Sequence, residues 1–212
     1  QDKPKEFSAV RSLGISGQMH GATLIDKNNN ILRPCILWND TRSMSQCIEM
    51  EKNYPSLREK SGNIAMPGFT APKLLWVKQN EPDIFNQIHK VLLPKDYLRF
   101  KLTGSYFSEM SDASGTLWLD VKNRQWSEDL LNLTGLNLAH MPELVEGNDP
   151  TDTLSSKLKD DLDFERDIVV AGGAGDQAAG AIGSGVIDTN QSMISLGTSG
   201  VYFSPASKFS SN

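Results

Sequence analysis

A short apolar run that ends in a cluster of glycines constrains this chain more than any other feature. The β-branched residues 167–171 predict a buried strand, and the glycines within 172–175 predict a tight turn directly after it. Asp176 comes next, at the start of the small, helix-compatible stretch 177–182. This order places a carboxylate near a helix N-terminus, where the helix dipole favours its ionised form. Asp176 could then orient a hydroxyl and accept its proton, or it could serve only as the N-cap of the helix.

A second glycine turn lies about one helix further along. Residues 191–196 alternate polar and apolar side chains, and the turn Gly197-Thr198-Ser199-Gly200 predicts a β-hairpin. Such a turn can direct several backbone N–H groups at one anion and bind a phosphate without a lysine. A hairpin without any ligand is the alternative. The turn is not a Walker A loop, because the Gly-Lys-Ser/Thr ending is absent.

Composition narrows the class of protein. A net charge of −5 argues against a nucleic-acid partner or an anionic membrane surface. The sequence has no apolar run of about 18 residues, and its first residues lack the apolar centre of a signal peptide, so we expect a soluble, cytoplasmic protein. Cys35 and Cys47 do not form a disulfide framework, and the scattered His20, His89 and His140 predict no metal site.

The remaining pattern predicts strands near the start and helices in the middle. We expect strands over residues 9–15 and 22–26, and a turn at 27–30. Apolar spacing predicts helices over 41–54, 71–80, 83–90 and 93–102, the last closed by Gly104 as a C-cap. Residues 144–166 are acidic and rich in loop formers, which predicts an internal seam.

Several segments, taken in order, resemble the FGGY family of carbohydrate kinases. They are 16–21 (SGQMHG), 36–42 (ILWNDTR), 68–80 (GFTAPKLLWVKQN), 94–98 (PKDYL) and 111–115 (SDASG). Together they are far more specific than any single glycine motif. The resemblance implies an α/β fold, an actin-like ATPase or ribonuclease H-like domain that packs against a second such domain across the active site.

The resemblance also implies how much of such a kinase is present. Residues 1–212 would form most of the N-terminal domain, which binds sugar and carries the catalytic base. That domain would be incomplete at its N-terminus, because the family's first phosphate hairpin is not found, and neither is its C-terminal nucleotide-binding domain. We therefore expect a fragment that is inactive alone.

The resemblance is strongest to members that phosphorylate D-xylulose at its 5-hydroxyl, giving D-xylulose 5-phosphate. It implies that Asp176 is the catalytic base for that hydroxyl. Met19 and His20 would bind the sugar, at positions where glycerol-phosphorylating members carry Arg-Glu. His20 can donate and accept hydrogen bonds, and Met19 can pack against the carbon skeleton. Gln177 stands where many such members carry Asn, and it would bind a sugar hydroxyl.

The phosphate side of the expected site rests on the second turn. Gly197, Thr198, Ser199 and Gly200 would lie near the transferred phosphoryl group of ATP. With no lysine among them, neutralisation of the phosphate charge would fall to Mg²⁺, whose principal Asp ligand in the family belongs to the missing hairpin.

For four further residues, the sequence allows either a role in the site or a purely structural role. Trp38 and Asp40 could line the sugar pocket, or they could be a core residue and a helix cap. Lys73 and Trp76 belong to the family signature but lie in an amphipathic helix, so we expect them to pack rather than to take part in chemistry.

Two other functions remain as alternatives. One is a different FGGY kinase, a ribulokinase or a glycerol kinase. The other is a sugar-binding module without catalysis. The expected partners are D-xylulose, MgATP and the missing C-terminal domain, with no nucleic acid and no membrane, and the sequence leaves a homodimer open.

Overall fold

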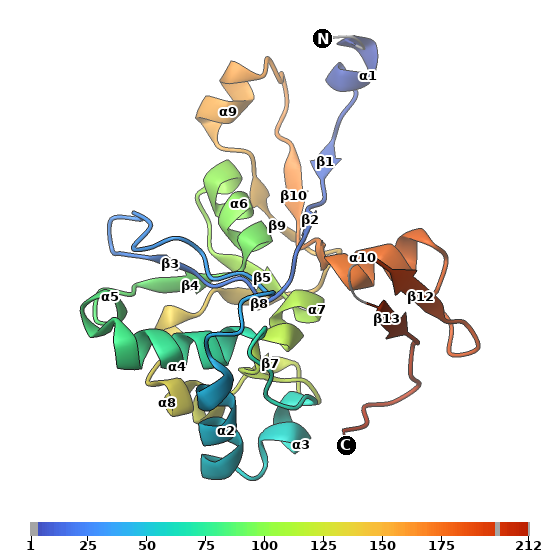
Figure 1. The fold of residues 1–212 in the computed structure, drawn as a ribbon. Helices are drawn as coiled ribbons and strands as arrows, with labels where there is room; N and C mark the ends of the chain where they lie inside the picture. Colours follow the sequence, from blue (N-terminus) through green and yellow to red (C-terminus); the bar gives the residue numbers. More distant parts are fainter. Residues whose placement is uncertain (1–3, 198–199, 212) are drawn as a thin grey trace.

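The structure is a computed structural model, which describes residues 4–197 and 200–211 (Figure 1). Two pairs of parallel strands join the first two strands to strands more than 150 positions later in the sequence, within residues 169–175. Strand β1 (Ser12–Leu13) pairs with β10 (Val169–Ala171), and β2 (Ser16–Gly17) pairs with β11 (Ala174–Gly175). Antiparallel β9 (Pro150–Thr153) lies on the other side of β10 and completes a sheet of order β1-β10-β9.

The middle of the chain adds further strand pairs. Strand β3 (Thr23–Ile25) runs antiparallel to β4 (Lys90–Leu92), and β5 (Phe107–Glu109) runs parallel to β8 (Glu143–Val145). Short β6 (Leu119–Asp120) and β7 (Gln125–Trp126) form an antiparallel pair. A final hairpin joins β12 (Met193–Leu196) to β13 (Gly200–Phe203) and projects from the body beside α10 (Figure 1).

Helices cover these strands at both ends of the molecule (Figure 1). They are α1 (Pro4–Ser8), α2 (Met44–Asn53), α3 (Leu57–Ser61), α4 (Thr70–Asn80), α5 (Pro82–Phe85), α6 (Pro94–Thr103), α7 (Met110–Ala113), α8 (Glu128–Thr134), α9 (Ser156–Asp161) and α10 (Asp176–Gly183), with 3₁₀ turns at Ser114–Thr116 and Leu138–His140. Within the described ranges, none of these helices is long and apolar enough to span a bilayer.

Two apolar clusters hold the fold. The larger one packs α2, α4 and α8 against β3 and β4, with Leu24, Leu74 and Trp118 almost completely buried. Burial of one such side chain stabilises the fold by about 1.5–3 kcal/mol. A smaller cluster around Ile168 and Val170 lies beneath the β1-β10-β9 sheet. Strand β2, which pairs with β11, lies near the middle of the molecule in Figure 1.

Most of the locally encoded predictions are confirmed. Helices α4 and α6, strand β10 and the β12–β13 hairpin lie where the sequence pattern placed them. Gly104 closes α6 with a φ of 87°, the left-handed conformation that glycine adopts without strain.

Three predictions were wrong in extent. Residues 9–15 form only the short β1, because a turn follows the end of α1 at Ser8 and only Ser12 and Leu13 pair with β10. The helix predicted over 83–90 ends at Phe85, and Lys90–Leu92 instead pairs with β3. The segment 144–166 is not a seam, because its strand β9 hydrogen-bonds into the same sheet as β10.

Candidate active site

The pairing of β2 with β11 brings the two ends of the expected site together. Its parallel register aligns Ser16 with Ala174 and Gly17 with Gly175. Parallel strands end at the same edge of a sheet, so Met19 and His20 leave β2 beside the point where Asp176 leaves β11. Burial lowers the pKa of His20, and the Asp176 carboxylate is close enough to oppose part of that shift.

Asp176 is presented to solvent at the start of α10. The N-cap of this helix is Gly175, and Asp176 is its first residue, so the interpretation of Asp176 as the N-cap was wrong. Its side chain is exposed, and Oδ1 accepts a hydrogen bond from the Gln177 N–H at 2.9 Å. Gln177 itself is half-buried. The carboxylate therefore faces outward at the positive end of a helix dipole.

His20 is fixed in one orientation. Its Nδ1 lies 2.8 Å from the Gly115 carbonyl oxygen, which can only accept, so Nδ1 carries the hydrogen. The ring also meets the Phe69 ring edge-on, with centroids 4.6 Å apart. Burial lowers the pKa of His20 below its usual value, and Lys73 lowers it further, against the opposing Gly115 hydrogen bond and Asp176 charge. At neutral pH the imidazole is neutral and its Nε2 is an acceptor.

Close packing at two glycines explains how His20 approaches the 3₁₀ turn Ser114–Thr116 and how Met19 approaches β11. A Cβ at Gly115 would lie 2.4 Å from His20 Cε1, and a Cβ at Gly175 would lie 2.9 Å from Met19 Cγ. Both distances are far below a normal carbon–carbon contact. Any side chain at these positions would push Met19 and His20 out of place.

The segment around Trp38 and Asp40 is neither core nor helix cap. Trp38 is 46% exposed, which excludes the core interpretation, and the N-cap of α2 is Ser43 rather than Asp40. Asp40 instead accepts two hydrogen bonds from the Arg42 guanidinium, at 2.9 and 2.7 Å. These bonds hold the pKa of Asp40 below its usual value. The Arg42 guanidinium in turn lies 4.8 Å from the centre of the Trp76 ring.

The second glycine turn is described only at its edges. Gly197 is exposed, and Gly200 begins β13, opposite Leu196. Thr198 and Ser199 lie outside the described residues, so their phosphate-binding role stays a prediction. The hairpin contacts α10 through Met193, whose Sδ lies 3.4 Å from the Ser184 Oγ.

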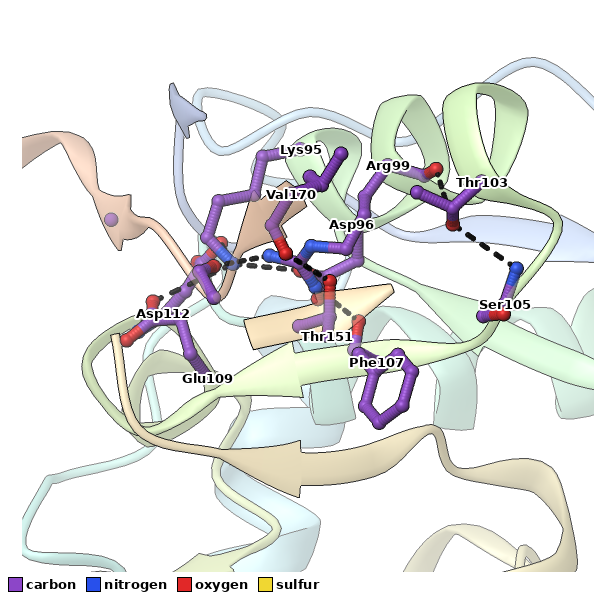
Figure 2. A network of polar contacts seen from close by, with 12 residues as sticks. Lys95, Asp96, Arg99, Thr103, Ser105, Phe107, Glu109, Asp112, Thr151 and Val170 are labelled. Carbon is purple, nitrogen blue, oxygen red and sulfur yellow. Dashed lines mark hydrogen bonds and ion pairs between the residues drawn. The ribbon is translucent and has the colours of Figure 1, made fainter. Parts of the chain in front are cut away.

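Sequence reasoning missed a buried cluster of charged side chains (Figure 2), carried by α6 and α7, which pack against β2 and β11, and by the neighbouring β5. We call it the ionic cluster; it consists of Lys95, Asp96 and Arg99 of α6, Glu109 of β5 and Asp112 of α7. All five side chains are at most 2% exposed. Three of these residues lie in segments that resemble the family, 94–98 and 111–115. This resemblance was the sequence feature that could have pointed to the cluster.

Lys95 is the centre of the ionic cluster. Its Nζ lies 2.7 Å from Asp96 Oδ1, 3.3 Å from Asp112 Oδ2 and 3.5 Å from Glu109 Oε1. Burial opposes the charge of Lys95, but these carboxylates outweigh it and raise its pKa. Burial also raises the pKa of Asp112, to about 8, against the pull of the Lys95 charge. Burial therefore favours the neutral, protonated form of Asp112 beside Lys95.

The ionic cluster connects to the residue before Asp176. Glu109 caps α7 by accepting hydrogen bonds from Ser111 N–H at 2.7 Å and from its hydroxyl at 2.9 Å. Ser111 Oγ accepts in turn from the Gly175 N–H at 3.0 Å. Arg99 donates to the Gly172 carbonyl in the turn between β10 and β11. The turn that carries Asp176 is thus attached to α6, β5 and α7.

Metal ligands do not gather in the described part of the chain. It contains no group of three or more His, Cys, Asp or Glu side chains arranged to hold a metal ion. Cys35 and Cys47 are both free thiols, and burial raises the pKa of Cys47 to about 11.

Comparison with known proteins shows which family the chain is similar to. The model of the N-terminal domain of the FGGY family of carbohydrate kinases matches residues 5–183. The xylulose kinase of Escherichia coli (strain K12) is 54% identical over 94% of this chain and 41% of its own length. The chain thus spans about 41% of that curated relative.

Solved structures agree with the family match. A xyloylose kinase from Brucella ovis superimposes with a TM-score of 0.93 at 54% identity, over 96% of this chain and 42% of that chain. A Plasmodium falciparum glycerol kinase with ADP gives a TM-score of 0.79 at 27% identity, over 89% of this chain and 38% of its own. These neighbours confirm the expected fold class, an α/β domain of the actin-like ATPase type.

Proposed function

Because the chain belongs to the FGGY family of carbohydrate kinases, we propose that the protein containing it transfers the γ-phosphoryl group of ATP to the 5-hydroxyl of D-xylulose. The similarity to xylulose kinases from two organisms supports this choice of sugar. One observation carries the assignment to this site. Because β2 pairs in parallel with β11, His20 and Asp176 follow these strands at the same edge of the two-stranded sheet.

Asp176 is the base in this proposal. The 5-hydroxyl oxygen of the sugar forms a bond to the γ-phosphorus of ATP while the bond from that phosphorus to the β,γ-bridging oxygen breaks, releasing ADP. The hydroxyl proton passes to the Asp176 carboxylate. Phosphoryl transfer depends mainly on positioning and electrostatics, so the base need not remove the proton early. An exposed carboxylate at the first position of α10 is suited to orienting the hydroxyl.

Met19, His20 and Gln177 bind the sugar. His20 donates from Nδ1 to Gly115, and this leaves Nε2 free to accept a hydrogen bond from a sugar hydroxyl. Met19 packs at Gly175 and offers an apolar surface to the carbon chain. Gln177 contributes an amide beside the base. In this proposal Trp38 and Asp40 would also contact the sugar, because an exposed indole face suits its C–H groups.

ATP enters the proposal through the family and through the turn at Gly197–Gly200, whose backbone N–H groups would contact the transferred phosphoryl group. Kinases of this kind commonly use Mg²⁺ to neutralise phosphate charge. Mg²⁺ of this kind is usually held by one or two carboxylates together with water and the phosphates of the nucleotide. With ATP and a free sugar as substrates, the protein would act in the cytoplasm.

A substrate panel tests the proposal. ADP release by the protein is measured with D-xylulose, L-ribulose and glycerol, and we expect the highest kcat/KM with D-xylulose. A preference for glycerol or L-ribulose would assign the protein to another branch of the family. No sugar-dependent ADP release would refute the kinase proposal and favour a sugar-binding module. Xylulose-dependent ADP release by residues 1–212 alone would exclude that module interpretation for this chain.

A further inference from the structure

A buried ammonium group lies beneath the proposed sugar site. Lys73 of α4 is 0% exposed, and its Nζ donates hydrogen bonds to the His20 carbonyl at 3.0 Å and to the Ile36 carbonyl at 3.3 Å. Among the described residues the structure gives it no ion pair at salt-bridge distance. An unpaired buried cation is costly, so its retention calls for a physical reason.

The two carbonyls that Lys73 binds belong to two different loops. His20 is a non-glycine residue with a φ of 70°, a conformation that costs free energy and persists only where its surroundings impose it. The same carbonyl accepts a hydrogen bond from the Thr70 hydroxyl at 3.1 Å, one turn before Lys73. Ile36 lies just before Trp38. One side chain therefore ties the His20 loop to the Trp38 loop.

We propose that Lys73 is a positioning residue that, with Thr70, holds the backbone of His20 in its strained conformation and so aims the imidazole at the sugar. This inference rests on the proposed function for its kinetic readout. Lys73 does not touch reacting atoms in it. Loss of its two hydrogen bonds would free the His20 backbone to relax, and Nε2 would move away from the sugar hydroxyl.

The environment of Lys73 adds a pH dependence. Burial lowers the pKa of Lys73 to about 8, while Cys35 in its thiolate form and the Asp40 carboxylate raise it, and the imidazole of His20 also faces it. Above that pH the ammonium loses its charge, and its hydrogen bonds to the two carbonyls weaken. The KM for the sugar should rise as the pH passes through about 8.

The kinetic test compares two lysines of the same helix. We expect Lys73→Met to raise the KM for D-xylulose about tenfold or more, the loss of roughly one charge-assisted hydrogen bond, with little change in the KM for ATP. Lys78→Met, at an exposed position of α4, should leave both KM values unchanged. The rise in KM above about pH 8 should disappear in Lys73→Met. Equal sugar KM values in the two variants would overturn the proposal, as would an equal rise in the KM for ATP.

A second pair of variants covers the case in which Lys73→Met does not fold. Thr70→Val removes the other donor to the His20 carbonyl, and Thr70→Ser keeps it. We expect a raised sugar KM in Thr70→Val and its recovery in Thr70→Ser. If the sugar KM rose in both Thr70→Val and Thr70→Ser, the cause would be altered packing and not the lost hydrogen bond. That result would contradict the positioning role.

A substrate-free measurement separates this inference from the proposed function. Long-range ¹H–¹⁵N NMR reports which imidazole nitrogen of His20 carries the hydrogen. The inference predicts the Nδ1–H form in the wild type and in Lys78→Met, and a mixture of tautomers in Lys73→Met and in Thr70→Val. An unchanged tautomer in both of these variants would refute it, whatever sugar the protein phosphorylates.

Discussion

Replacing Asp112 by asparagine should change how the stability of the protein depends on pH. Asp112 is completely buried, and burial raises its pKa to about 8 in the folded state, whereas an Asp in an unfolded chain has a pKa of about 3.9. Folding therefore takes up a proton over this range. The contribution of Asp112 to stability is full below about pH 4 and is lost as the pH rises through about 8.

The size of the effect on the free energy of unfolding follows from the single proton that Asp112 takes up on folding. Each pH unit within that window lowers the free energy of unfolding by about 1.4 kcal/mol through Asp112. Between about pH 6 and 7.5 the loss is about 2 kcal/mol. An asparagine side chain cannot titrate, so the Asp112→Asn variant avoids this loss and gains about 2 kcal/mol relative to the wild type over the same interval.

Urea unfolding at a series of pH values measures this difference. Asp129→Asn is the matched control, because the hydrogen bond from Lys60 lowers the pKa of Asp129 and keeps it ionised throughout the interval. Its difference from the wild type should stay constant. A difference between the wild type and Asp112→Asn that also stays constant would show that Asp112 is ionised beside Lys95, and it would contradict the raised pKa of Asp112.

Two further predictions concern the attachment of the site to the fold. Ser111→Ala removes the acceptor of the Gly175 N–H and should lower kcat about tenfold. Ser108→Ala is the control, because its buried hydroxyl lacks a partner in the described structure, and it should leave kcat unchanged. Equal effects of the two variants on kcat would contradict the link between Ser111 and Gly175. Gly115→Ala places a Cβ 2.4 Å from the His20 ring, so the sugar KM should rise severalfold in steady-state assays, and an unchanged KM would show that the ring does not bind the sugar.

Local sequence patterns were enough to predict much of the fold. The periodicity of residues 71–80 and 93–102 and the glycine at 104 determine α4 and α6 because neighbouring turns and caps encode them. Strand β4 could not be found in this way. Residues 83–90 have helical spacing, but Val91 and Leu92 pair with β3 from a distant part of the chain. Such a tertiary contact overrides local preference.

The candidate site was predictable in part for the same reason. The glycines around Asp176 and the Met19-His20 pair are local motifs, and β-strand pairing brings them together. The partners of Lys73 and Lys95 were hidden, because a lysine in an amphipathic helix normally faces solvent. Only the fold shows that Lys73 meets the carbonyl of His20 and that Lys95 meets carboxylates of β5 and α7.

The most direct test of the account is the turnover of the Asp176→Ala variant with D-xylulose and ATP. Loss of a positioned base typically lowers the rate by about 10²–10⁴-fold, and we expect a fall of that size in kcat while the sugar still binds. Asp188→Asn, an exposed carboxylate beyond α10, is the control and should keep wild-type turnover. An Asp176→Ala variant with near-normal kcat would contradict the assignment of this carboxylate as the base.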